Sequence, residues 1–173
     1  MRIKNIVDED FVNYQLPSMF IGTCFCGGKC CTEANMPLYS CQNDVWRTLP
    51  IINIKNSDIV NRYLRNPITQ AIVIGGLEPF EQWDELKELI QEFRANTDDD
   101  IVIYTGYNPE ELEYQLRWLT TYDNIIIKFG RYVPNCDGRY DDILGVTLAS
   151  NNQFAANITK EFVEKFRKEG KTS

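Results

Sequence analysis

The sequence has no histidine among its 173 residues, and this limits the chemistry that the chain can perform. Catalysis by a Ser–His or Cys–His pair is excluded, and so is any metal site with an imidazole ligand. A metal bound by this chain must therefore be held mainly by sulfur or by carboxylate oxygen.

Net positive charge and long apolar runs are also lacking. The net charge of −7 and the pI of about 4.7 argue against a nucleic-acid backbone as the main ligand. The longest apolar stretches are strand-sized, far short of the roughly 20 residues that a membrane span needs. The N-terminal segment runs into Asp8-Glu9-Asp10 rather than into an apolar secretion signal, so we expect a cytoplasmic protein.

Cysteine is the residue type that is present and clustered. Five of the six cysteines follow the apolar run 19–23, which predicts a buried strand that ends in a thiol-rich loop. We expect this loop to span residues 26–49, with a short helix near 44–47, and a loop of this length is usually functional. The clustered cysteines are Cys24, Cys26, Cys30, Cys31 and Cys41. The sixth, Cys136, lies apart from them, and we assign it no role.

The cysteine spacing leaves three interpretations open. Cytosolic thiols stay reduced, so a cluster of them favours metal binding over disulfides. Cys26-x3-Cys30 followed by Cys41 would supply three thiolates to a 4Fe–4S cluster and leave one iron open for another ligand. The alternatives are a structural zinc site, although no C-x2-C pair is present, or unligated cysteines in the core.

The rest of the chain predicts a single α/β domain over residues 1–173. Apolar runs at 71–74, 101–104 and 124–127 indicate buried strands, each followed by a turn, and the first two are followed by a helical pattern. We expect a last strand at 143–148 and a final helix at 159–167. Repeated strand–helix units imply a mostly parallel sheet, whose ligands bind beyond the carboxyl ends of the strands.

Polar and glycine-rich turns follow several of these strands. Gly75-Gly76-Leu77-Glu78 could hold the ammonium group of a small ligand, or could be a plain turn whose Glu78 favours a helix N-terminus. Thr105-Gly106-Tyr107 could likewise be only a turn. Ser150, Asn151 and Asn152 are suited to ribose hydroxyls or a carboxylate, or could form a solvated loop.

Taken together and in order, these stretches resemble the radical SAM superfamily, specifically its small members that activate anaerobic (class III) ribonucleotide reductase. The resemblance covers about residues 18–155. Gly75-Gly76-Leu77-Glu78-Pro79 is similar to the Gly-Gly-Glu-Pro turn, Tyr104-Thr105-Gly106-Tyr107 matches Tyr-Thr-Gly-Tyr, and residues 149–153 are similar to Gly-Ser-Ser-Asn-Gln. The family's C-x3-C-x2-C pattern would place a third cysteine at position 33, which is Glu33, and Cys41-Gln42-Asn43 looks like that ligand displaced by an insertion.

The resemblance implies a partial (βα) barrel and a radical SAM oxidoreductase. Its implied cofactors are a 4Fe–4S cluster, held by Cys26, Cys30 and Cys41, and S-adenosyl-L-methionine. Gly75, Gly76 and Glu78 would border the methionine end of the latter, and Thr105, Ser150, Asn151 and Asn152 would contact the rest of it. Reductive cleavage would then place a glycyl radical on a partner enzyme such as anaerobic ribonucleotide reductase.

The implied electron donor is a reductant such as flavodoxin or ferredoxin, and neither nucleic acid nor membrane is an expected partner. Departures at Glu33, Leu77 and Phe129 indicate a divergent subfamily and leave the substrate open. The alternatives are a radical SAM enzyme acting on a peptide or small molecule, and a non-catalytic zinc- or cluster-binding module. Cys24 and Cys31 remain rival ligands at this point.

Overall fold

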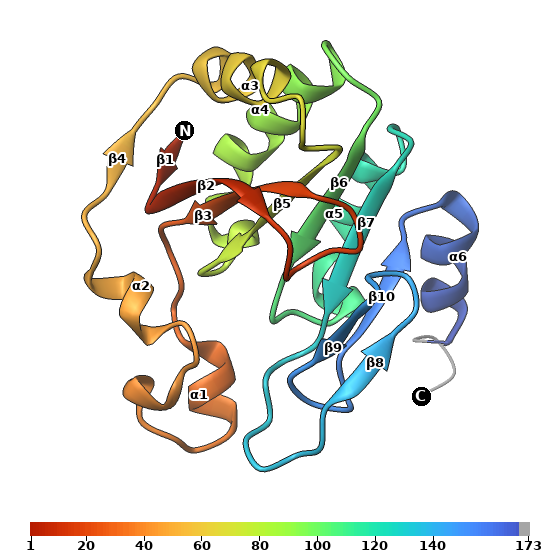
Figure 1. The fold of residues 1–173 in the computed structure, drawn as a ribbon. Helices are drawn as coiled ribbons and strands as arrows, with labels where there is room; N and C mark the ends of the chain where they lie inside the picture. Colours follow the sequence, from red (N-terminus) through yellow and green to blue (C-terminus); the bar gives the residue numbers. More distant parts are fainter. Residues whose placement is uncertain (170–173) are drawn as a thin grey trace.

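The computed structural model describes residues 1–169 and has a six-stranded sheet at its centre (Figure 1). The strand order is β10-β7-β6-β5-β3-β2, and β3, β5, β6 and β7 pair in parallel while the two outer strands run antiparallel. The strands are β2 (Asn5–Asp10), β3 (Ser18–Thr23), β5 (Ala71–Gly76), β6 (Asp100–Tyr104), β7 (Ile125–Phe129) and β10 (Phe154–Asn157). The prediction of an α/β fold with a mostly parallel sheet is therefore confirmed.

Different elements pack on the two faces of the sheet. Ile72 and Ile74 pack into the core against the helices, whereas Ala71 and Val73 belong to a second apolar cluster on the other face. This alternation follows from the two-residue period of a strand. The helices on the first face are α3 (Asn56–Arg65), α4 (Trp83–Arg94), α5 (Glu113–Leu119) and α6 (Lys160–Glu169).

Among the described residues, the helices contribute to the second cluster only through Trp46 of α2 (Asp44–Thr48), which packs against it. Tyr14 from the β2–β3 connection covers this face, together with Leu144 and Leu148 from the region of a separate hairpin. That hairpin consists of β8 (Arg139–Asp141) and β9 (Val146–Leu148), which pair antiparallel. This face, which α3 to α6 leave uncovered, therefore has room for a ligand near the ends of the parallel strands.

The cysteine segment lies beyond the carboxyl end of β3 and contains two short helices, α1 (Lys29–Glu33) and α2 (Asp44–Thr48) (Figure 1). Trp46 of α2 packs on Phe20 with ring centroids 5.6 Å apart. A Cβ atom built on Gly22 would lie 2.3 Å from the Trp46 ring, so the close contact needs glycine there. After α2 the chain forms β4 (Ile52–Asn53), which pairs antiparallel with β1 (Arg2–Ile3) near the N-terminus.

Two expectations from the sequence were wrong in detail. The segment 143–148 is not the last strand of the main sheet: β9 belongs to the hairpin, and β10 completes the sheet. Sequence reasoning missed β10 because Phe-Ala-Ala-Asn has few of the β-branched residues that mark a strand. The segment 26–49 is also more regular than expected, since it contains α1 in addition to the predicted helix near 44–47. Of the predicted domain, residues 170–173 lie outside the described part.

Candidate functional site

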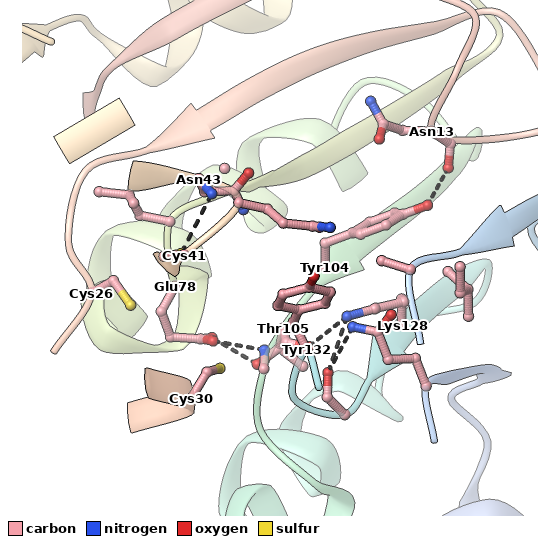
Figure 2. A pocket seen from close by; sticks show the side chains of 18 of the residues that line it. Asn13, Cys26, Cys30, Cys41, Asn43, Glu78, Tyr104, Thr105, Lys128 and Tyr132 are labelled. Atoms are coloured by element: carbon pink, nitrogen blue, oxygen red, sulfur yellow. Dashed lines mark hydrogen bonds between the residues drawn. The ribbon is translucent and has the colours of Figure 1, made fainter. Parts of the chain in front are cut away.

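A cavity of about 420 Å³ opens on the sheet face opposite α3 to α6, at the carboxyl ends of β5, β6 and β7 (Figure 2). The cysteine segment forms one wall, and β9 with the residues after it forms another. The sheet thus brings together the strand ends at which ligands of parallel folds bind. Four cysteines line the cavity: Cys26, Cys30, Cys31 and Cys41.

Main-chain N–H groups act on three of these four sulfur atoms. Cys26 Sγ accepts the N–H two residues further on at 3.3 Å, and Cys41 Sγ does the same at 3.4 Å. The main-chain N–H of Tyr132, which follows β7, acts on the Cys30 thiol and lowers its pKa, against the effect of burial. Hydrogen bonds to cysteine sulfur stabilise thiolate ligands and help to set the potential of iron–sulfur clusters. Cys26, Cys30 and Cys41 therefore have the surroundings of thiolate ligands.

The other cysteines are placed differently. Cys31 is 3% exposed and donates its S–H to the carbonyl oxygen of Leu38 at 4.0 Å, and its thiol also interacts with that of Cys41. Cys24 is buried outside the cavity lining, and its main-chain N–H donates to the side chain of Gln82. Cys136 lies in the connection between β7 and β8, outside the cavity lining. Of the two rivals, only Cys31 is within reach of the site.

Burial raises the pKa of the Cys26 and Cys30 thiols, and the main-chain N–H that acts on each opposes this shift. Because metal ligation requires the thiolate, binding of a metal group must displace these protons. Over residues 1–169, no three Cys, Asp or Glu side chains converge on a single ion position.

Glu78 is buried in the cavity wall and accepts three hydrogen bonds. Its Oε1 accepts from the Thr105 hydroxyl at 2.7 Å and from the N–H of Phe80 at 3.2 Å, and its Oε2 accepts from the N–H of Gly106 at 2.9 Å. Burial raises its pKa to about 7, against the effect of these donors. Glu78 and Thr105 thus join the turn after β5 to the turn after β6, and one carboxylate lone pair remains for a ligand.

Lys128 of β7 is the main site residue that sequence reasoning missed. Its Nζ lies in the cavity wall and donates to the carbonyl oxygens of Gly130 at 3.1 Å and Thr105 at 3.4 Å (Figure 2). Burial lowers its pKa to about 8, opposed by the charges of Cys30 and Glu78. A charged group at the end of the apolar run 125–127 was the available signal, because buried lysines are rare unless they have a partner.

The other predicted ligand residues lie around this cavity in two groups. Gly76, with φ of 87°, lines it, whereas Gly75 packs against the Tyr104 side chain. Ser150 and Asn152 instead donate to the carbonyl oxygen of Arg131, and Asn151 is exposed outside the lining. Residues 150–152 reach this edge because they precede an antiparallel strand, and their role in binding a cofactor stays a prediction.

Glu33 stands where the resemblance would place a cysteine, and the structure gives it an ion partner instead. Arg131 Nη2 donates to Glu33 at 2.9 Å, and Arg131 also binds both oxygens of Glu111 at 2.7 and 2.8 Å. Lys29 at the start of α1 pairs with the same Glu111. The helix that carries Cys30 is thereby tied by charge to the ends of the neighbouring strands.

The residues present fit an iron–sulfur cluster. The donor set consists of thiols with N–H partners, and Gly106 leaves the space beside Cys30, because a Cβ atom there would lie 2.8 Å from its sulfur. A family model described as a 4Fe–4S single cluster domain matches residues 19–153, which include every lining cysteine. No curated protein and no solved structure matches the chain.

Proposed function

The chain belongs to the 4Fe–4S single cluster domain family, and from that membership we propose that it is a radical SAM enzyme of the glycyl-radical-activating type. The observation that carries the proposal is the number of suitable thiols. Main-chain N–H groups act on the thiols of three cavity-lining cysteines, while the fourth donates its S–H to a carbonyl oxygen. Three ligands for four irons leave one coordination position for a substrate.

In this proposal the cluster, when bound and reduced, supplies the electron with which S-adenosyl-L-methionine is cleaved to methionine and a 5′-deoxyadenosyl radical. The protein residues bind and orient. Cys26, Cys30 and Cys41 hold the iron. Gly76 allows a ligand to approach the end of β5, where a side chain would meet Gly22 and Trp46.

The charged groups of the cavity match the methionine end of this substrate. The ammonium of Lys128 is suited to the carboxylate, since its present acceptors are two neutral carbonyl oxygens. The free lone pair of Glu78 is suited to the amino group. A buried lysine and a buried glutamate in one wall are costly without a ligand, which supports a zwitterionic occupant.

The proposed architecture is the partial barrel of the radical SAM fold. In support of it, the helices α3–α6 cover one face of the sheet and the cavity lies on the other. Such an arrangement leaves a side of the cavity accessible to a loop of a partner protein. The described helices are all too short or too polar to cross a bilayer.

The proposed partner is a glycyl-radical enzyme such as anaerobic ribonucleotide reductase, and the proposed electron donor is a flavodoxin or a ferredoxin. The proposal places these reactions in the cytoplasm. The hydrogen atom that the 5′-deoxyadenosyl radical takes would come from a glycine Cα of the partner, giving 5′-deoxyadenosine.

The test is anaerobic reconstitution with iron and sulfide, followed by reduction with dithionite and addition of S-adenosyl-L-methionine. We expect 5′-deoxyadenosine as a product of the wild type and of Cys136→Ala, and its loss in Cys41→Ala. Substoichiometric iron without cluster absorbance or product would contradict the proposal. Product formation with no glycyl radical on a candidate reductase would instead favour a peptide or small-molecule substrate.

A further inference from the structure

Helix α2 connects the cysteine segment to the sheet, and its two central residues face different surroundings. Trp46 packs on Phe20 of β3, as described above. The next residue, Arg47, directs its guanidinium into the cysteine segment, where Nη1 donates to the carbonyl oxygen of Cys26 at 2.8 Å. The buried ammonium of Lys4 donates to the carbonyl oxygens of Arg47 and Leu49 and so fixes the end of α2.

The guanidinium of Arg47 lies close to two of the cavity-lining cysteines. Its charge acts on the thiols of both Cys26 and Cys31. A Cβ atom built on Gly28 would lie 3.4 Å from Arg47 Nη2, so the guanidinium reaches the turn between Cys26 and Cys30. The turn between Cys26 and Cys30 thus lies beside a permanent positive charge.

This guanidinium is incompletely satisfied by the protein. Nε and Nη2 of Arg47 are buried and have no hydrogen-bond acceptor within residues 1–169. The nearest carboxylate oxygen, Oδ1 of Asp44, is 3.7 Å from Nε, and the Asp44 side chain is 39% exposed. A buried donor without an acceptor is costly. Its position beside the thiols indicates that negative charge on the iron–sulfur group is what Arg47 compensates.

We propose that Arg47 is an electrostatic positioning residue that fixes the Cys26 turn and stabilises the reduced state of the cluster. The inference rests on the cluster and its cysteine ligands, and not on cleavage of S-adenosyl-L-methionine. Reduction adds one electron from a donor such as dithionite and breaks no bond, so the net negative charge rises by one. A nearby fixed cation stabilises the more negative state, and net charge is one of the factors that set cluster potentials.

The experiment compares Arg47→Gln and Arg47→Lys with the wild type in reconstituted protein. Arg94→Gln is the matched control, because Arg94 is also a partly buried arginine that donates to carbonyl oxygens, but at the opposite edge of the sheet. The readouts are iron and sulfide per chain and the reduction potential, measured by titration with EPR detection. Neither readout depends on turnover.

We expect Arg47→Gln to lower the equilibrium constant for reduction about tenfold, which corresponds to about 59 mV for a one-electron couple. Arg47→Lys should retain most of the wild-type potential, and Arg94→Gln all of it. An unchanged potential in Arg47→Gln, or an equal shift in Arg47→Lys, overturns the inference.

If Arg47→Gln fails to take up the cluster, Arg47→Lys still tests the inference. Arg47→Lys must then still take up the cluster with a potential close to that of the wild type, and its failure to do so overturns the role of the charge. A wild-type chain that takes up no iron and sulfide contradicts the cluster itself, and with it both this inference and the proposed function. A loaded wild type that fails to cleave S-adenosyl-L-methionine contradicts only the latter.

Discussion

The two edges of the parallel sheet differ in how far their buried polar groups find hydrogen-bond partners within the protein. At the edge where the strands begin, Tyr63 donates to Asp99 at 2.5 Å and Tyr14 donates to Asp100 at 2.8 Å. Arg94 donates there to three main-chain carbonyl oxygens. At the edge where the strands end, Lys128 donates only to neutral carbonyl oxygens, and two nitrogen atoms of Arg47 have no acceptor in the described residues.

This difference indicates that the edge where the strands begin contributes to stability and the edge where they end contributes to function. At the first edge most polar groups satisfy one another, although Nε of Arg94 has no acceptor in the described residues. The pKa of Tyr63 is raised there by burial and by its hydrogen bond to Asp99. Groups at the second edge keep charge and hydrogen-bond donors without a partner in the described residues. The family places a 4Fe–4S cluster in this domain. In related architectures too, residues at the carboxyl ends of the strands carry the chemistry and those at the other end carry stability.

The largest effect is expected from substitutions of the cysteines at the edge where the strands end. Cys26→Ala, Cys30→Ala and Cys41→Ala should each lower cluster affinity by at least about 100-fold, since losing even an outer-sphere partner costs about 10- to 100-fold. Cys31→Ala should retain the cluster, because this thiol donates to Leu38 rather than accepting an N–H. Iron and sulfide analysis after anaerobic reconstitution measures this, with Cys136→Ala as the control.

Loss of iron in Cys31→Ala with retention in Cys41→Ala would identify Cys31, and not Cys41, as the third ligand. Retention of the cluster in all the single variants would contradict a three-thiolate site.

Lys128→Met should give the next largest effect and should separate function from stability. Binding of S-adenosyl-L-methionine should weaken about tenfold or more, as expected for loss of a hydrogen bond to a charged group. The free energy of unfolding should rise by about 1 kcal/mol, because a buried charge that donates only to carbonyl oxygens is removed. Calorimetric titration and urea unfolding measure the two quantities. Weaker binding accompanied by lower stability would indicate a structural role instead.

Glu111→Gln should weaken the attachment of α1 in a pH-dependent way. Hydrogen bonds from Arg131 lower the pKa of Glu111 from 4.5 to about 2, against a smaller effect of burial. Its stabilisation is therefore present above pH 4.5 and lost as the pH falls towards 2. With the carboxylate 24% exposed, we expect a loss of about 1 to 2 kcal/mol at pH 7.

Unfolding of the Glu111→Gln variant and the wild type at pH 7 and at pH 2.5 tests this prediction. The difference in unfolding free energy between the two proteins should shrink at the lower pH. A difference that does not depend on pH would show that packing, and not the carboxylate charge, is what the substitution removes.

Tyr63→Phe should have the smallest effect and should leave the site intact. Removing the hydroxyl that donates to Asp99 should lower the free energy of unfolding by about 1 kcal/mol, as for a typical hydrogen bond. Iron content after reconstitution should equal that of the wild type. A large fall in iron content would show that the two edges of the sheet are coupled and do not serve separate roles.

The inner strands of the sheet could be predicted from the sequence for a simple reason. Runs such as Ile101–Tyr104 are apolar at nearly every position, as strands buried on both faces must be. Helix α1 could not be predicted, because Lys29–Glu33 has no apolar face and owes its position to ion pairs with Glu111 and Arg131. Those partners lie about 80 to 100 residues away along the chain.

The candidate site could be predicted in part. The cysteine cluster and the turn at Glu78 are visible as local patterns in the sequence. Choosing Cys41 over Cys31 depends on hydrogen bonds that only the folded loop provides. Lys128 and Arg47 follow no motif, since each acquires its role from groups that the fold brings to it.

The central claim is that three cysteines hold a cluster with one iron position open to S-adenosyl-L-methionine. The most direct measurement is the EPR spectrum of the reduced, reconstituted protein before and after S-adenosyl-L-methionine is added. The account predicts a spectrum of a reduced 4Fe–4S cluster that changes on addition, in the wild type and in Cys31→Ala alike. A cluster spectrum that stays the same at saturating S-adenosyl-L-methionine would contradict it.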